Sequence, residues 1–285
     1  MALDRPEFRP DPALSREEME ALQRRIADAA VFTDDIAFDP AAVAVDGPID
    51  ADASGNERLG ASSDAPVVVG VDQAFLEERA VSAIVAIQDG AVIERVHAVT
   101  PLSIPYIPGL LAFREGGPIL AAFEQLSVEP DLAVFDGSGR IHFRQAGIAT
   151  HVGVALDLPS VGVAKRLLCG EPTASVEVRP AGWSTPIEAD DSVVDRRETT
   201  EKRAGRETTR EQGGEAPAGT TIGHAYQSRQ WDRDQSINPL YVSPGHRVSA
   251  ATTRDLVDAL CAGYKLPEPT RLADRYADDT KAALG

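Results

Sequence analysis

Short runs of β-branched and other apolar residues, bounded by turn residues, dominate the chain from residue 67 onward. Such runs are typical of buried strands. They predict strands at 67–73, 79–88, 91–99, 132–136 and 160–164. The Asp89-Gly90 pair predicts a tight hairpin turn between the second and third runs. Because helical patterns separate the later runs, we expect an α/β fold, with a mixed sheet of three antiparallel strands then parallel strands, flanked by helices.

Amphipathic segments predict the helices of this fold. Ser15 and Glu18 have the spacing of a capping box, and Met19, Leu22 and Ile26 follow at helical intervals, which predicts a helix over about 15–31. Further helices are expected at about 110–126, 144–156 and 249–262. The Gly116-Gly117-Pro118 sequence should kink or split the first of these three.

Three segments lack a regular pattern of apolar positions. Residues 33–65 are acidic and rich in small residues, which predicts a mobile surface loop. Residues 186–222 are nearly all charged, small or Thr, which predicts a disordered segment or a β-hairpin inserted into the domain. The last ten residues, 276–285, are expected to form a charged tail. The chain is therefore expected to hold one core domain at 67–275, on which residues 1–66 pack.

Charge changes the picture of the surface. The net charge is −17, and only four of the 28 basic side chains are lysines, at positions 165, 202, 265 and 281. An excess of Asp and Glu with little Lys is the composition expected of a protein that works in concentrated salt, where the Debye length falls to about 3 Å at 1 M. In that medium the net charge does not exclude nucleic-acid binding, and local arginines decide instead.

Several other functional classes are disfavoured. Cys169 and Cys261 are isolated and belong to no Cys-x-x-Cys pair, so neither a zinc site nor a disulfide framework is expected. No dinucleotide-binding or P-loop motif is present. The charged N-terminus does not resemble a signal peptide, and no run of apolar residues is long enough to span a membrane. We expect a cytoplasmic monomer.

Three carboxylates indicate the chemistry. Asp72 and Asp136 each end a predicted strand, and Glu115 lies between them in the chain. Any one of them alone would be a common turn or surface residue. On neighbouring strands, however, the two aspartates would repel each other unless a cation neutralised them. Hard divalent ions such as Mg²⁺ take carboxylate and phosphate oxygens, so the pattern favours a metal-dependent phosphodiesterase.

A series of motifs then resembles one known family. In chain order the motifs are Gly70-Val71-Asp72, Ile104-Pro105-Tyr106-Ile107-Pro108-Gly109, Phe113-Arg114-Glu115, Asp136-Gly137-Ser138-Gly139, Gly162-Val163-Ala164-Lys165, Gly245-His246-Arg247-Val248-Ser249 and Leu266-Pro267-Glu268-Pro269-Thr270-Arg271. Together they resemble endonuclease V, the deoxyinosine-specific repair nuclease of the ribonuclease H-like fold. The resemblance runs from about 67 to 275 and omits the charged insertion.

The resemblance implies a catalytic apparatus. Asp72, Asp136 and Glu115 would bind Mg²⁺, for which Mn²⁺ could substitute. His246 would be the active-site histidine near the metal, and Lys165 would neutralise phosphate charge. The strand would be cut at the second phosphodiester bond on the 3′ side of deoxyinosine, leaving a 3′-hydroxyl and a 5′-phosphate.

The resemblance also implies a wedge and a base pocket. Tyr106, stiffened by prolines on both sides, would fill the place of the extruded base. The base pocket would be formed by Gly109, Leu111, Gly137, Gly147, Ile148, Ala164, Leu168 and His142. His151 is expected in the core. Arg114, Arg140, Arg144 and Arg247 would form the local phosphate-binding patch. Ser138, and Gln73 after the first aspartate, depart from the usual family pattern.

Other functions stay open at this point. The protein could be an inosine-specific endoribonuclease, because a shared pocket does not distinguish DNA from RNA and the 2′-hydroxyl beside the cut would decide. It could also be a non-catalytic binder of hypoxanthine-containing strands, which the three retained carboxylates argue against. A metal-binding fold without base preference is disfavoured by the intact Pro-Tyr-Ile-Pro loop.

Overall fold

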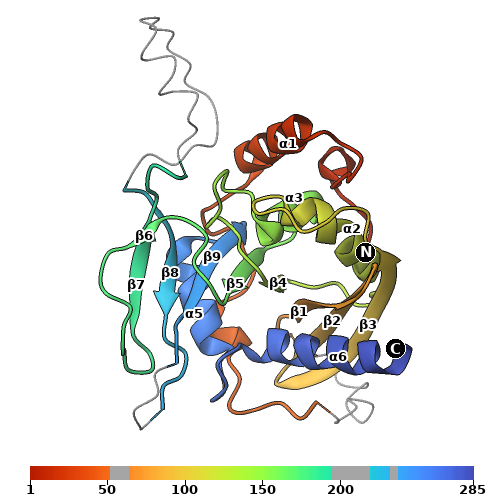
Figure 1. The fold of residues 1–285 in the computed structure, drawn as a ribbon. Coiled ribbons are helices and arrows are strands. Elements are labelled where there is room, and N and C mark those ends of the chain that lie inside the picture. The colour runs from red at the N-terminus through yellow and green to blue at the C-terminus, as the bar shows by residue number, and fades with distance from the viewer. Residues whose placement is uncertain (52–63, 194–218, 232–236) are drawn as a thin grey trace, which may run out of the picture.

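The computed structural model describes residues 1–51, 64–193, 219–231 and 237–285, which form a nine-stranded mixed sheet flanked by helices (Figure 1). The strands are β1 (Val68–Leu76), β2 (Arg79–Gln88), β3 (Ala91–Pro101), β4 (Leu132–Asp136), β5 (Ser160–Ala164), β6 (Glu171–Pro172), β7 (Ser184–Glu188), β8 (Thr221–Tyr226) and β9 (Leu240–His246). The helices are α1 (Arg16–Ala29), α2 (Leu111–Phe123), α3 (Ile148–Leu156), α5 (Ala250–Ala259) and α6 (Glu268–Leu284), with short 3₁₀ turns η1 (Pro6–Phe8) and η2 (Pro40–Val43).

The strand order places the ends of the central strands together. The order is β3-β2-β1-β4-β5-β9-β8-β7-β6, in which β1, β4 and β5 run parallel to one another and the other neighbours pair antiparallel. The expected mixed α/β sheet is confirmed. Val71 pairs with Phe135, so Asp72 and Asp136 follow side by side on adjacent strands at one edge.

Both faces of the central sheet are covered by helices. Val68 and Val134 face one side, where they pack with residues of α5 and α6 such as Leu256 and Leu272. Their neighbours on each strand face the other side and pack with α2 and α3. Burial on both faces explains why these strands appear in the sequence as unbroken apolar runs. In the described ranges, no helix is long and apolar enough to cross a membrane.

Helix α2 is not split by its glycines and proline. It runs unbroken from Leu111 to Phe123 with Pro118 inside it. Gly116 has a packing role, because a Cβ there would lie 2.7 Å from Cγ of Pro10. The missing side chain thus lets the N-terminal segment lie directly against the helix.

The described part of the acidic segment 33–65 is packed rather than loose. Val43 and Ile49 are buried in the same core as α5 and α6. The Ile49 N–H donates to the buried carboxylate of Glu268 at 2.7 Å, and Arg271 Nη2 donates to the Ile49 carbonyl at 2.7 Å. Two apolar side chains and these paired backbone groups are enough to order a segment whose composition suggested mobility. Residues 52–63 lie outside the described residues.

The expected charged tail at 276–285 is instead the second half of α6 (Figure 1). Leu272, Ala273 and Ala277 are buried at helical spacing against the sheet, while the charged side chains occupy the other face of the helix. Small alanines at the buried positions hid the amphipathic pattern. The ends of the charged insertion form β7 and β8, which pair antiparallel as a hairpin. Residues 194–218 lie outside the described residues.

Candidate active site

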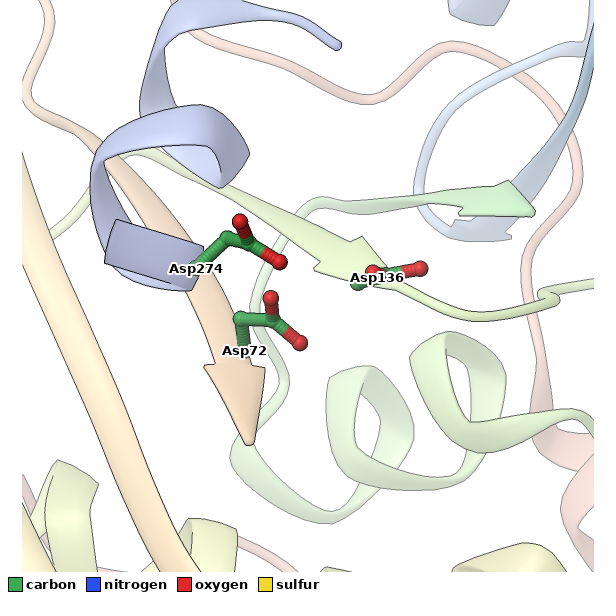
Figure 2. A group of neighbouring side chains, drawn as sticks. All are labelled: Asp72, Asp136 and Asp274. Atoms are coloured by element: carbon green, nitrogen blue, oxygen red, sulfur yellow. The ribbon is translucent and has the colours of Figure 1, made fainter. Parts of the chain in front are cut away.

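Three aspartates meet at the place where the pairing of β1 with β4 ends, with Asp72 in the middle of β1 and Asp136 at the end of β4. Asp72 comes from β1, Asp136 from β4 and Asp274 from α6, and Figure 2 shows their carboxylates turned toward one another. One oxygen of each lies within 4.8 Å of the others. Asp274 was not among the residues singled out from the sequence, because no helix was predicted over this end of the chain and residues from 276 onward were expected to form a tail. The Leu272/Ala273/Ala277 spacing was the signal that could have revealed it.

The cluster is electrostatically unfavourable by itself. Burial, followed by the charges of Asp136 and Asp274, raises the pKa of Asp72 from its ordinary 3.8 to about 9. Burial and, to a smaller extent, the charge of Asp136 raise the pKa of Glu115 to about 7, against the opposing effect of Arg114. A raised carboxyl pKa means that the folded protein resists the charged form. The site therefore favours an added positive charge.

Lys165 supplies one positive charge at this edge. It follows β5, and its Nζ lies 2.7 Å from Asp136 Oδ2 and 4.0 Å from Asp274 Oδ1. Burial alone would lower the pKa of Lys165, but the surrounding carboxylates raise it overall. The ammonium group is thus held in its charged form beside the acidic cluster.

Glu115 lies next to the cluster rather than within it. Its carboxylate pairs with Arg114 Nη1 at 3.0 Å, and its carbonyl accepts from Gln73 Nε2 at 3.0 Å. The guanidinium of Arg114 also lies 4.5 Å from the ring centre of Phe75. The closely grouped set is therefore Asp72, Asp136 and Asp274. Glu115 lies beside this set, near enough that the charge of Asp136 contributes to its raised pKa.

The donor set fits a hard divalent cation. It consists of carboxylate oxygens at half-buried positions, which is the chemistry that Mg²⁺ and Mn²⁺ bind. The raised pKa of Asp72 indicates that the surrounding protein groups do not compensate its negative charge. An ion held here would remove the repulsion that the fold otherwise imposes.

The proposed wedge and part of the proposed base pocket lie in the loop before α2. Tyr106 is 62% exposed at this loop. Gly109, with φ 78°, turns its carbonyl inward, where it accepts from Gln23 Nε2 at 2.9 Å and from His142 Nε2 at 3.1 Å. His142 Nδ1 in turn accepts from the Arg144 N–H at 3.1 Å, and burial lowers the pKa of His142 to about 3. His142 is therefore neutral and joins this loop to the loop after β4.

The other proposed pocket residues divide between two places. Gly137 lies against Ile148, and a Cβ at Gly147 would lie 2.2 Å from the carbonyl oxygen of Ser138, so these residues pack the turn after β4 onto α3. Ala164 ends β5 beside Asp136. Leu168 packs instead with the apolar cluster under β7 and β8, and Leu111 packs on the core beneath α2.

His246 does not lie near the acidic cluster, so its expected place near the metal is corrected. It ends β9 opposite Ser160, the first residue of β5, at the far edge of the sheet. The buried ring accepts from the Val31 N–H at 3.1 Å and donates to Asp157 Oδ1 at 3.0 Å. Burial lowers its pKa, so it is a neutral structural group.

The four arginines expected to form a patch are likewise separated. Arg247 lies with His246 at the far edge and pairs with Asp35. Arg144 binds the side chain of Gln23, and Arg140 binds Gln145 and lies over the ring of Phe32. Arg114 contacts the predicted site residue Glu115, and Arg144 contacts His142 through its backbone N–H and Gly109 through its guanidinium. His151 is buried and contacts the carbonyl of Phe8 at 2.9 Å.

The geometry defines a class of protein. A mixed sheet that presents aspartates on adjacent parallel strands, with helices on both faces, is an α/β fold of the ribonuclease H-like type. The endonuclease V family model matches residues 56–275. The chain belongs to the endonuclease V family, whose members are nucleases that act on damaged nucleic acid.

Individual relatives agree with this assignment. Endonuclease V of the halophilic archaeon Natronomonas pharaonis is 54% identical over 285 residues, covering 100% of this chain and 99% of the relative. The catalytic domain of human endonuclease V is 28% identical with a TM-score of 0.69, covering 95% of this chain and 99% of that one. Endonuclease V of Ciona intestinalis, bound to a 24mer DNA with an inosine followed by a ribo-adenosine, shares the fold at 22% identity and a TM-score of 0.60, covering 94% and 98%.

Proposed function

We propose that this protein is a divalent-cation-dependent endonuclease that nicks a DNA strand at the second phosphodiester bond 3′ to deoxyinosine, leaving a 3′-hydroxyl and a 5′-phosphate. The observation that carries this proposal is the convergence of Asp72, Asp136 and Asp274, with Lys165 beside them. Membership of the endonuclease V family supports the choice of lesion and of bond.

The acidic cluster and its neighbours have distinct roles in the proposal. Asp72, Asp136 and Asp274 would hold Mg²⁺ or Mn²⁺. Such an ion would supply Lewis-acid polarisation of the phosphate and a lowered pKa for an attacking water. Glu115, with a pKa raised to about 7, is suited to exchange a proton near neutral pH. Lys165 places a positive charge where phosphate would approach the carboxylates.

In this proposal the loop before α2, which carries Tyr106 and Gly109, recognises the base. Tyr106 is exposed on its proline-flanked loop and is suited to stack where a base has left the duplex. The loop behind it is held by the hydrogen bonds of Gly109 to Gln23 and His142. A neutral, buried His142 keeps this backbone rigid without adding charge to the pocket.

Cleavage of matched oligonucleotides tests the proposal. One DNA strand and one RNA strand, each with a single central inosine, are incubated in high KCl with Mg²⁺. We expect DNA to be cut at the second bond, Asp72→Ala to abolish the cut, and Asp278→Asn, an exposed change on α6, to retain it. Preferential RNA cutting would assign the protein to inosine-RNA cleavage. Binding of both strands without cutting would make it a non-catalytic binder.

A further inference from the structure

The edge of the sheet that holds the acidic cluster continues for four more strands. β9 begins at this edge because Tyr241 pairs with Ala164, the last residue of β5. β8 ends and β7 begins there, through the pairs Ala225–Tyr241 and Thr185–Ala225. From β4 to β7 the distance is four strand spacings, about 19 Å, roughly the length of five or six nucleotides along a duplex strand. The loops on these strands therefore form a surface that starts at the cluster.

Unpaired cations follow this edge. We use the term edge surface for Arg166 after β5, Lys265 between α5 and α6, Arg229 and Trp231 after β8, and Arg179 and Trp183 before β7. Lys165 lies near enough that, together with the larger effect of burial, its charge lowers the pKa of Lys265. In the part of the chain that the structure describes, none of the four cations of the edge surface forms an ion pair.

Aromatic rings alternate with these cations. The guanidinium of Arg229 lies 4.4 Å from the ring centre of Trp231, and that of Arg179 lies 4.7 Å from the ring centre of Trp183. Trp231 is 51% exposed, although large apolar side chains are usually withdrawn from water. Arginine and aromatic side chains on one exposed surface are the groups on which unpaired nucleobases stack beside their phosphates.

Hydrogen bonds join the loops into one surface. Gln230 Nε2 donates to the carbonyl of Arg179 at 3.0 Å, which links the loop after β8 to the loop before β7. Ser228 Oγ donates to the carbonyl of Lys265 at 2.6 Å, which links the same loop to the segment between α5 and α6. These loops extend from the ends of β7 and β8 at the end of the sheet where α6 lies (Figure 1). The loops that carry Arg179, Arg229 and Lys265 are thus held together before any ligand arrives.

We propose that the edge surface binds the single-stranded nucleic acid that flanks the lesion, with phosphates on Arg166, Lys265, Arg229 and Arg179 and one base stacked on Trp231. The inference rests on the proposed function, because the acidic cluster fixes where the strand begins. In a chain of net charge −17, four cations that form no ion pair with any carboxylate of the described residues are a local exception that complements phosphate.

Binding of labelled single strands tests the edge surface directly. Anisotropy gives the Kd of a short strand of three nucleotides on each side of inosine and of a long strand of twelve on each side. The variants are Arg229→Ala and Trp231→Ala. Arg25→Ala is the matched control, because Arg25 is an exposed arginine on α1 that also lies over a ring, 5.6 Å from the centre of Phe8.

We expect wild type to bind the long strand more tightly than the short one. The ratio of the short-strand Kd to the long-strand Kd should fall about fivefold or more in Trp231→Ala, because one stacked base is lost. Arg229→Ala should lower the slope of log Kd against log salt by about 0.7 for the long strand. Arg25→Ala should change neither quantity. Unchanged ratios and slopes in both edge variants would overturn the inference.

The two proposals fail in distinguishable ways. If wild type binds strands with the expected length dependence but cuts no inosine substrate, the edge surface stands and the proposed activity fails. If wild type cuts the inosine strand, and the edge variants have the same ratio of Kd values and the same salt slope as Arg25→Ala, the proposed activity stands and the proposed role of the edge surface fails. If the labelled strands do not bind and a protein from the same cell does, the surface is a protein-docking site and the inference is wrong.

Discussion

Replacing Asp72 by Asn should stabilise the protein when no divalent ion is present. The carboxylates of Asp72, Asp136 and Asp274 approach within 4.8 Å of one another. At an effective dielectric constant of 20, two charges at that distance repel by about 3 kcal/mol. The pKa of Asp72 is raised to about 9, first by burial and then by the charge of Asp136, and holding the group protonated at pH 7 costs about 4 kcal/mol relative to an ordinary carboxyl.

Asn keeps the shape and removes the charge, so the free energy of unfolding should rise by about 3 kcal/mol at pH 7. For a chain of this length that corresponds to an increase in Tm of about 5 °C. Mg²⁺ should then raise the Tm of wild type, because it binds the folded state alone, and should have a much smaller effect on Asp72→Asn.

Thermal melting in chelator and in excess Mg²⁺, at fixed molar KCl, measures both effects. Asp278→Asn on α6, the helix that carries Asp274, is the control, because its side chain is exposed and its removal should change stability by no more than about 0.5 kcal/mol. A fall in the Tm of metal-free Asp72→Asn, or an equal Mg²⁺ effect in both proteins, would show that burial of the Asp72 carboxylate beside the other two does not destabilise the metal-free fold.

Three further predictions concern groups outside the cluster. Gly70→Ala should destabilise the protein by more than about 3 kcal/mol in urea denaturation, because its Cβ would lie 2.0 Å from the carbonyl oxygen of Pro269 and displace α6, whereas Gly117→Ala, with no atom within 4 Å, should stabilise by up to about 1 kcal/mol; equal effects would contradict this. His246→Ala should lower stability by about 2 kcal/mol, because it leaves the Val31 N–H without its acceptor and removes one of the partners of Asp157, and it should leave the rate of inosine cleavage unchanged; a large loss of rate in a folded variant would return His246 to the active site. Burial lowers the pKa of His142 to about 3, so its contribution to stability is complete above pH 6.5 and is lost as the pH falls toward 3; because Glu115 and His151 also titrate between pH 7 and 5, urea titrations at these two pH values compare wild type with His142→Ala, and the change in stability between them should be about 2 kcal/mol less favourable in wild type, whereas an equal pH dependence in both proteins would mean that His142 is charged in the fold.

The ends of the two apolar runs are the part of the site that the sequence predicts best, although β1 itself continues beyond Asp72 to Leu76. Asp72 and Asp136 each follow a run of apolar residues, and parallel pairing of such runs necessarily brings their ends to one edge. Asp274 escaped prediction because alanines on the buried face of α6 gave the helix a charged composition. Asp274 lies beside Asp72 because the backbone at Pro269, at the start of α6, packs directly against Gly70, and no local sequence pattern predicts this contact.

His246 is a residue whose position could not be predicted from the local sequence. A histidine in a glycine-containing motif carries the same local signal whether its strand ends at the catalytic edge or at the far edge. The antiparallel pairing of β9 with β5 decides the matter, because it places the last residue of β9 beside the first residue of β5. Strand direction is a property of the whole sheet, and the direction of β9 was not predicted from the sequence.

The contact between Gly109 and His142 was predicted in part. Both residues were predicted as site residues, and the structure places them together through a 3.1 Å hydrogen bond. The third group on the same carbonyl, Gln23 of α1, was not predicted, because it lies 86 residues away in a helix assigned to packing. The N-terminal helix thus supports the loop that carries Tyr106.

Cleavage by Asp274→Asn tests most directly that three aspartates, one from each of β1, β4 and α6, form the catalytic centre. The wild type, Asp274→Asn and Asp278→Asn proteins are compared on one DNA strand with a central inosine, with saturating Mg²⁺ and molar KCl. Loss of a carboxylate from the cluster should lower the single-turnover rate about 100-fold or more, equivalent to about 3 kcal/mol, while Asp278→Asn cuts as wild type does. Equal rates in all three proteins would contradict the assignment of this cluster as the catalytic centre.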